Sequence, residues 1–331
     1  MVSHSSSDRL PGSRLKSFLI DAMFRRLIPT ILGLRYGWVD LLGWRLGHPS
    51  CRYTSSMTSG LFSICTTVLA EVMRLQHLGL RVDAIDVSRT FKPYKDAPGD
   101  DVSKVLFRMP ATWQPDRPLA FDVWDVHRPF KTQNLAGLHA AAMTLVPPSD
   151  IVQARAEHLM ESLGVVPEDT IACYYRGTDK GTEIDLAPVE RYIGIIERID
   201  AMCGTPRDIY LQTDTLRAQR ALQARFGSRV KIWDALPASD GTVGIHLMDV
   251  TQEFGVSRQE MGINMLAAVL VLARCRHVIT TSGNVGAWIA YYRGDARDLY
   301  QFGADGGMIE PDGVSTDETR EAARRATVPL G

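Results

Sequence analysis

The 331-residue sequence has no long hydrophobic run and no excess of one charge. Its longest unbroken apolar stretch, residues 265–273, has nine residues, whereas a helix needs about 20 to cross a bilayer. Arg and Lys number 37 against 38 Asp and Glu, so the basic surplus typical of nucleic-acid-binding domains is lacking. Residues 1–16 lack the apolar segment of a signal peptide. We therefore expect a protein that is not secreted, does not span a membrane and binds no nucleic acid.

Cysteine is scarce, and its spacing matches no metal site. The five cysteines are odd in number, scattered and mostly within apolar runs. We expect free, buried thiols in a reducing compartment. They are Cys51, Cys65, Cys173, Cys203 and Cys275.

The chain does have the composition of a globular protein, with 45% apolar and 23% charged residues. Its length exceeds what one hydrophobic core usually organises, so we expect two domains. The Pro-Pro-Ser-Asp break at residues 147–150 predicts a boundary between a first domain, 51–150, and a second, 151–302. Residues 303–331 are rich in glycine and acidic residues, and we expect a mobile tail there.

Residues 1–50 are basic, with seven Arg and Lys against three Asp. Within them, residues 17–34 have the apolar periodicity of an amphipathic helix. Such a helix either lies on an anionic membrane as a peripheral contact or caps the first domain. The second use is the more common one for an apolar helix face.

The first domain begins with the pattern strand, helix, strand, which is one βαβ unit. The Ser59-Gly60 turn that enters the helix either offers backbone N–H groups to an anion or is simply a tight turn. A polar cluster at residues 122–128 either cradles a sugar acceptor or pairs with itself. The expected elements are strands 52–57, 81–87, 105–107 and 119–124 and helices 61–77 and 151–163.

The second domain alternates strands with helices, a pattern typical of a parallel sheet covered on both faces. We therefore predict the α/β class for the whole chain. Residues 235–257 are irregular and long enough to line a site. The expected strands are 170–175, 208–212, 230–233, 277–281 and 298–302, and the helices are 188–203, 216–226, 259–274 and 284–293.

The loop that follows strand 170–175 carries the clearest chemistry. Ligands of open α/β sheets bind at the carboxyl ends of strands, where Arg176 lies. An arginine there can hold a phosphate through two parallel hydrogen bonds. Lys180 adds a second positive charge and Glu183 a candidate base. The alternative is an exposed charged turn in which Asp179 pairs with one of these cations.

Two more strand ends carry polar residues that suit a ligand crevice. Asp214 follows strand 208–212, where it either faces the ligand or caps the next helix. Strand 277–281 runs into a helix start whose amides favour a phosphate, although Ser282 could equally cap that helix. The candidate residues at this end are Thr281, Ser282, Gly283 and Asn284.

The run Tyr-Tyr-Arg-Gly-Thr-Asp-Lys-Gly-Thr-Glu, followed by Pro-Val-Glu-Arg-Tyr, resembles the first motif of the α-1,6-fucosyltransferases and their nodulation relatives. These belong to a GDP-fucose-dependent superfamily that includes protein O-fucosyltransferases. The resemblance implies that Arg176 binds the diphosphate and that Lys180 and Glu183 match the loop's lysine and base. By the same resemblance, Asp214 matches the first of two aspartates and Ser282 a phosphate-binding serine.

The sequence departs from that family at four places. Tyr174 stands where the family has a guanine-contacting histidine, Gly177 replaces its second arginine, and Thr215 replaces its second aspartate. In the helix before the last motif, the family has an acidic residue where this sequence has Ala267 or Ala268. Tyr174 could instead stack on a base, so a nucleotide other than GDP is an alternative.

The resemblance implies two Rossmann-like domains of the GT-B type and inverting transfer of fucose from GDP-fucose to a glycan acceptor. No Asp-x-Asp motif lies in a matching place, so we expect no metal cofactor. Because the membrane anchor of a Golgi enzyme is absent, we expect a bacterial cytoplasmic protein, which is peripheral to the inner membrane if residues 17–34 lie on it rather than cap the first domain. The alternatives are a transferase that uses another nucleotide-sugar and a catalytically silent nucleotide- or glycan-binding module.

Overall fold

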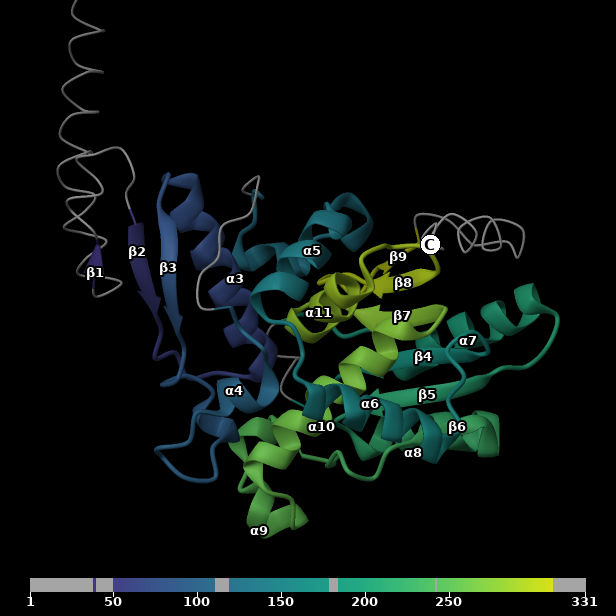
Figure 1. Ribbon diagram of the computed structural model, residues 1–331. Helices are drawn as coiled ribbons and strands as arrows, with labels where there is room; N and C mark the ends of the chain where they lie inside the picture. Colours follow the sequence, from purple (N-terminus) through teal and green to yellow (C-terminus); the bar gives the residue numbers. More distant parts are fainter. Residues whose placement is uncertain (1–37, 40–49, 111–118, 179–183, 242, 312–331) are drawn as a thin grey trace, which may run out of the picture.

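The computed structural model describes residues 38–39, 50–110, 119–178, 184–241 and 243–311. The described chain is a mixed α/β structure with two sheets, a three-stranded one and a six-stranded one. Figure 1 shows the small sheet on the left, the large sheet on the right, and α3, α10 and α11 between them. Parallel strands predominate, so the predicted α/β class is confirmed. The segment 17–34 lies outside the described residues.

The small sheet has the order β1-β2-β3 and contains the expected βαβ unit. Strands β2 (Ser50–Thr54) and β3 (Arg81–Asp86) are parallel, and β1 (Trp38–Val39) pairs antiparallel with β2. Helix α3 (Leu61–His77) connects β2 to β3 and buries a stripe at helical spacing: Leu61, Ile64, Cys65, Val68, Leu69, Val72 and Leu75.

The segment between the sheets differs most from the sequence-based expectation. The expected strand 105–107 is wrong, because α4 (Val102–Leu106) is helical. The expected strand 119–124 is also wrong, because Asp122 and Asp125 form a capping box that closes a 3-10 turn, η2 (Val123–His127). The remaining elements are η1 (Lys92–Tyr94), η3 (Phe130–Thr132), the unpredicted α5 (Leu135–Leu145), and α6 (Asp150–Leu163).

The large sheet has the order β6-β5-β4-β7-β8-β9. All its pairs are parallel except the last, in which β9 pairs antiparallel with β8. Residues 303–309, which we expected to begin a mobile tail, instead form a turn and β9. The strands are β4 (Thr170–Tyr175), β5 (Asp208–Thr213), β6 (Val230–Ile232), β7 (His277–Thr281), β8 (Leu299–Phe302) and β9 (Met308–Ile309).

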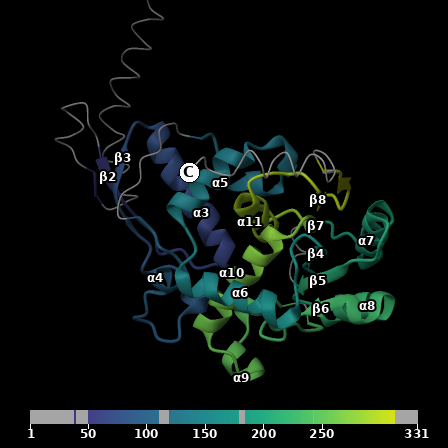
Figure 2. The ribbon, with the colours of Figure 1, turned by 45° about the vertical axis from the view of Figure 1, so that its right-hand side comes forward.

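Helices cover both faces of the large sheet, as the sequence pattern predicts. Along β4, Ile171 and Cys173 join one core with α7 and α8, whereas Ala172 and Tyr174 join the other with α6, α10 and α11 (Figure 2). The expected irregular stretch 235–257 contains two short helices. The helices are α7 (Val189–Cys203), α8 (Leu216–Phe226), η5 (Gly227–Arg229), η6 (Ile245–Leu247), α9 (Val250–Phe254), α10 (Arg258–Arg274) and α11 (Asn284–Arg293).

One hydrophobic core links the small sheet to the large one. At its centre the indole Nε1 of Trp288 in α11 donates to Thr66 Oγ1 in α3 over 2.9 Å, and the ring packs against Phe62. The boundary at residues 147–150 stays a prediction. All five cysteines are free and four of them are buried, with Cys203 half-buried. Among the described helices, none combines the length and apolarity needed to cross a bilayer.

Candidate functional site

The strand order places a crevice between β4 and β7. Strands β5 and β6 follow on one side of β4, whereas β7 and β8 lie on its other side, so the order reverses between β4 and β7. The chain leaves β4 toward α7 on one face of the sheet and leaves β7 toward α11 on the other. Ligands of open α/β sheets bind outside the carboxyl ends of the strands at such a point. Arg176 and Asn284 follow these two strand ends.

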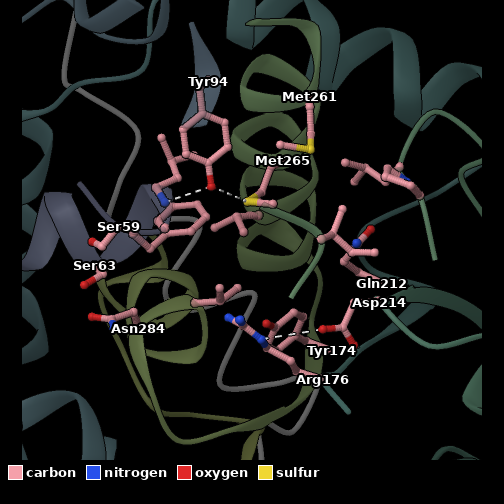
Figure 3. A pocket seen from close by; sticks show the side chains of 18 residues that line it. Ser59, Ser63, Tyr94, Tyr174, Arg176, Gln212, Asp214, Met261, Met265 and Asn284 are labelled. Carbon is pink, nitrogen blue, oxygen red and sulfur yellow. Dashed lines mark hydrogen bonds and ion pairs between the residues drawn. The ribbon is translucent and has the colours of Figure 1, made fainter. Parts of the chain in front are cut away.

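A cavity of about 310 Å³ opens at this point and extends to the start of α3 (Figure 3). Its volume falls at the lower end of the range typical of small-molecule sites. Residues from the first half of the chain form one wall and residues from the second half the other. The polar lining residues are Ser59, Ser63, Tyr94, Tyr174, Arg176, Gln212, Asp214 and Asn284.

Asp214 fixes the loop that carries Arg176. Its carboxylate accepts hydrogen bonds from the Gly177 amide (2.9 Å) and from Thr178 Oγ1 (2.7 Å), and it lies 3.5 Å from Arg176 Nε. Asp214, at the end of β5, thereby anchors the loop that follows β4. The Arg176 side chain keeps 23% of its surface exposed and lines the cavity, so the ion pair does not seal it away from a ligand.

Helix α11 begins at the cavity wall, where Asn284 and Val285 line the space beside Arg176. Its N-cap residue is Gly283, which has no side chain to cap the helix. The first amides of an α-helix have no intrahelical partner, and the aligned peptide dipoles place partial positive charge there. The start of α11 therefore favours an anion on the side of the cavity that Arg176 also faces.

The residues expected to bind phosphate just before α11 are placed differently. Thr281 and Ser282 are buried. Neither they nor Gly283 are among the described residues that line the cavity. The Ser282 amide donates to the Phe302 carbonyl, and the Gly283 amide to that of Val126. Gly283 has φ of 112° and ψ of 178°, a conformation that essentially only glycine adopts. The amides open to a ligand thus begin at Asn284, the last of the four predicted residues.

Helix α3 also begins at the cavity, and Tyr94 completes its first turn. Tyr94 is buried, and its hydroxyl accepts a 2.9 Å hydrogen bond from the Leu61 amide (Figure 3). Burial raises the pKa of Tyr94 to about 12, against a smaller lowering by the charge of Arg176. The neutral phenol therefore stays in place as an acceptor at ordinary pH. The alternative of an anion-accessible Ser59-Gly60 turn remains, because both residues line the cavity.

Replacing Tyr94 by Phe is expected to lower the free energy of unfolding by about 1–2 kcal/mol, because the Leu61 amide loses its buried acceptor. Urea-induced unfolding with an unchanged m-value would measure this loss. Tyr175→Phe in strand β4 is a matched control, since Tyr175 is half-buried, packs on Tyr192 and does not line the cavity. Equal stability of Tyr94→Phe and the wild type would contradict the capping role.

The far wall of the cavity is apolar. Met261, Met265 and Val269 lie four residues apart on α10 and face the space together. Leu236 adds to this wall from a loop tied to β5, since the Ser239 amide donates to the Asp214 carbonyl. Sequence reasoning missed this stripe because α10 is apolar on nearly all sides. It also missed Tyr94 and Gln212, for which the sequence carried no signal.

The described lining of this cavity includes none of the remaining predicted residues. Lys180 and Glu183 lie outside the described residues. The polar cluster at 122–128 is paired with itself: Asp122 accepts from the Trp124 amide, and Arg128 lies 3.1 Å from Asp125. This confirms the self-paired interpretation of that corner. Across the described part of the chain, no three His, Cys, Asp or Glu side chains gather closely enough to hold a metal ion.

Gly177 and Thr215, two of the positions at which the sequence departs from the fucosyltransferase motifs, lie close together. A Cβ added to Gly177 would lie 3.0 Å from Thr215 Cγ2 and 3.0 Å from Tyr175 Cε1. A side chain at position 177 would therefore need Thr215 to move. Ala267 and Ala268 are fully buried in α10 and do not line the cavity.

No protein-family model and no curated protein matches the sequence. Among solved structures, NodZ α-1,6-fucosyltransferase soaked with GDP-fucose aligns over 78% of this chain and 97% of its own, with 14% identity and a TM-score of 0.50. Fucosyltransferase NodZ from Bradyrhizobium aligns over 78% and 98%, with 16% identity and a TM-score of 0.46. Arabidopsis thaliana FUT1 in complex with GDP aligns over 52% and 36%, with 12% identity and a TM-score of 0.32.

The likeness at a TM-score of 0.50 extends over nearly the whole NodZ structure and over 78% of this chain. At 14% identity it bears on the fold alone. The chain therefore has the fold of a fucosyltransferase, as its sequence resemblance predicts.

Proposed function

We propose that this protein is a glycosyltransferase that binds a nucleotide-sugar in the 310 Å³ cavity and transfers fucose from GDP-fucose to a glycan acceptor with inversion. The observation that carries this proposal is the meeting of Arg176 with the starts of α3 and α11 at the point where the strand order reverses. One guanidinium and two helix N-termini direct positive charge into one small space. A diphosphate is the ligand chemistry that such an arrangement suits.

In the proposed reaction, the bond between the anomeric carbon and the diphosphate oxygen breaks while the acceptor hydroxyl attacks from the opposite face. Arg176 and the first amides of α11 stabilise the negative charge that develops on the departing diphosphate. Glu183 takes the proton of the acceptor hydroxyl, and Lys180 supports the diphosphate. These last two roles come from the sequence resemblance.

The nucleoside of the donor would lie toward Tyr174 and the stripe of Met261, Met265 and Val269. A tyrosine and flexible thioethers offer an apolar, polarisable surface to a base. Such a surface reads the edge of a base less selectively than a hydrogen-bonding histidine does. A transferase that uses a different nucleotide-sugar is therefore the second candidate, and the presence of Tyr174 at the cavity favours it.

Thermal unfolding with GDP, UDP and dTDP, each alone and as its sugar conjugate, tests the proposal. A ligand at 100 times its dissociation constant stabilises the folded state by about 2.7 kcal/mol. We expect the unfolding temperature to rise with GDP and GDP-fucose, and to rise equally with EDTA present, because we propose no metal. A rise with UDP or dTDP alone would support the second candidate. No rise with any nucleotide would refute a nucleotide-sugar site.

A further inference from the structure

A second hollow lies beside the small sheet, on the loops that leave its two parallel strands. It has a volume of about 800 Å³. The chain after β2 contributes Ser56, and the chain after β3 contributes Ser88, Arg89, Lys92, Lys95 and Asp96. We call it the basic groove.

Three cations in the basic groove face one carboxylate that is already engaged. Asp96 accepts hydrogen bonds from the amides of Arg258 (2.8 Å) and Gln259 (3.4 Å), and so serves the first turn of α10. Arg89 and Lys92 are exposed, and within the described residues neither forms an ion pair. Asp86 lies just outside the groove, and its pKa is lowered by hydrogen bonds from Ser88 and, to a smaller extent, by the charge of Arg89. The residues that line the groove therefore carry three positive charges against the one negative charge of Asp96.

The loop that carries these cations is anchored from inside. Thr90, Phe91 and Tyr94 are buried and alternate with the outward Arg89, Lys92 and Lys95. Phe91 has φ of 57° and ψ of 26°, a left-handed conformation that is uncommon for a bulky residue and persists only where the surroundings impose it. Its ring packs on Phe107. The charged side chains are thus held on a fixed segment.

Two further hydrogen bonds hold the loop in place. Lys95 Nζ donates to the Ser88 carbonyl over 2.7 Å and closes the loop on itself. Tyr94 joins it to the start of α3 through the Leu61 amide. A site that is formed before its ligand arrives loses less entropy on binding.

The basic groove and the nucleotide-sugar cavity are separate hollows lined by neighbouring residues of the same two chain segments. On the first segment, Ser56 lines the groove and Ser59 the cavity. On the second, the outward Lys92 and Lys95 line the groove, and the buried Tyr94 between them lines the cavity. A ligand held in the groove therefore lies within a few residues of the chain that lines the cavity.

We propose that the basic groove binds the acceptor of the transfer and that this acceptor is an anionic saccharide, recognised by Arg89, Lys92 and Lys95 through carboxylate, sulfate or phosphate groups. The assignment of the groove as an acceptor site rests on the proposed glycosyltransferase function. The binding itself does not depend on catalysis. Carboxylates and phosphates accept two parallel hydrogen bonds from an arginine and point-charge contacts from lysines.

The test measures direct binding of labelled oligosaccharides to the full chain by fluorescence anisotropy. The probes are tetragalacturonate for carboxylate, a chondroitin sulfate tetrasaccharide for sulfate, a phosphorylated mannotetraose for phosphate, and chitotetraose as the neutral oligosaccharide. We expect at least one anionic probe to bind tenfold or more tightly than chitotetraose, and to weaken as salt screens the charges. The probe that binds most tightly identifies the anion.

The variant Arg89→Gln/Lys92→Gln removes both positive charges, keeps unbranched polar side chains and leaves the Lys95 hydrogen bond intact. We expect it to bind the preferred anionic probe at least tenfold more weakly, with nucleotide-induced stabilisation unchanged. Lys104→Gln is the matched control, since Lys104 is an exposed lysine on α4 outside the groove. Adding Lys95→Gln should weaken binding further.

Equal binding of anionic and neutral probes, or unchanged binding in the double variant, would overturn the proposal. Failure of the proposed function would give a different result. Nucleotides would then not stabilise the wild type, while anionic saccharides would still bind the groove.

Discussion

Replacing Arg176 by Ala is expected to reduce donor turnover by about 100-fold or more, because loss of one preorganised charge partner of the leaving group costs about 3 kcal/mol of transition-state stabilisation. Release of GDP from GDP-fucose, with and without acceptor, measures the effect. The fold should stay intact. Asp214 keeps its hydrogen bonds from Gly177 and Thr178 after the guanidinium is gone, so the loop after β4 remains tied to β5.

Two further arginine variants sharpen this prediction. Arg176→Lys keeps the charge but loses the planar guanidinium, and we expect it to retain activity between that of Ala and the wild type. Arg220→Ala is the control, since Arg220 is an exposed arginine that pairs with Asp240 and does not line the cavity. Near-normal turnover in Arg176→Ala, with an unchanged far-ultraviolet spectrum, would refute the proposed role of Arg176.

Replacing Gly286 by Ala is expected to destabilise the protein by about 3 kcal/mol or more, at the upper end for overpacking. A Cβ at this position would lie 1.9 Å from the Thr281 carbonyl oxygen and 2.9 Å from Thr280 Oγ1. Neither β7 nor the first turn of α11 can move without disturbing the other. We expect the unfolding temperature to fall by roughly 4 °C or more. Nucleotide-induced stabilisation should also be lost, because Asn284 and Val285 would be displaced from the cavity wall.

Gly194→Ala provides the matched control for that substitution. Gly194 is an exposed residue inside α7, and a Cβ there would meet nothing within 4 Å. Replacing an unhindered helical glycine by alanine usually stabilises a protein by about 0.4–1 kcal/mol. If both variants behaved alike, close packing of α11 on β7 would not be the cause of the Gly286 effect.

The site follows from the way the sheet is ordered. Arg176 and Asn284 are more than 100 residues apart in the chain. They meet because β4 and β7 are neighbours and their helices leave on opposite faces. The Trp288–Thr66 hydrogen bond then sets the start of α11 against α3, so that a third element from the first half of the chain closes the cavity.

The sequence by itself determined the strands and helices of the second half. Strand 170–175, strand 277–281, helix 216–226 and helix 284–293 have the predicted bounds. The strands are short segments buried along nearly their whole length, helix 216–226 buries Ala218 and Leu222 on one face, and helix 284–293 lies between Gly283 and Gly294. The arginine at the end of β4 was identified from the same pattern. A strand end and a polar loop are local features, so neighbouring residues suffice to predict them.

Only the tertiary structure decided the short elements and the remaining wall of the cavity. The segments near 105 and 120 were expected to be strands. Short apolar runs do not specify their partners, and here α4 packs as a helix while the η2 turn is closed by its own carboxylates. Tyr94 reaches the Leu61 amide, and Met265 reaches the cavity, through contacts between residues far apart in the chain. Such contacts depend on how the elements pack, which no local period encodes.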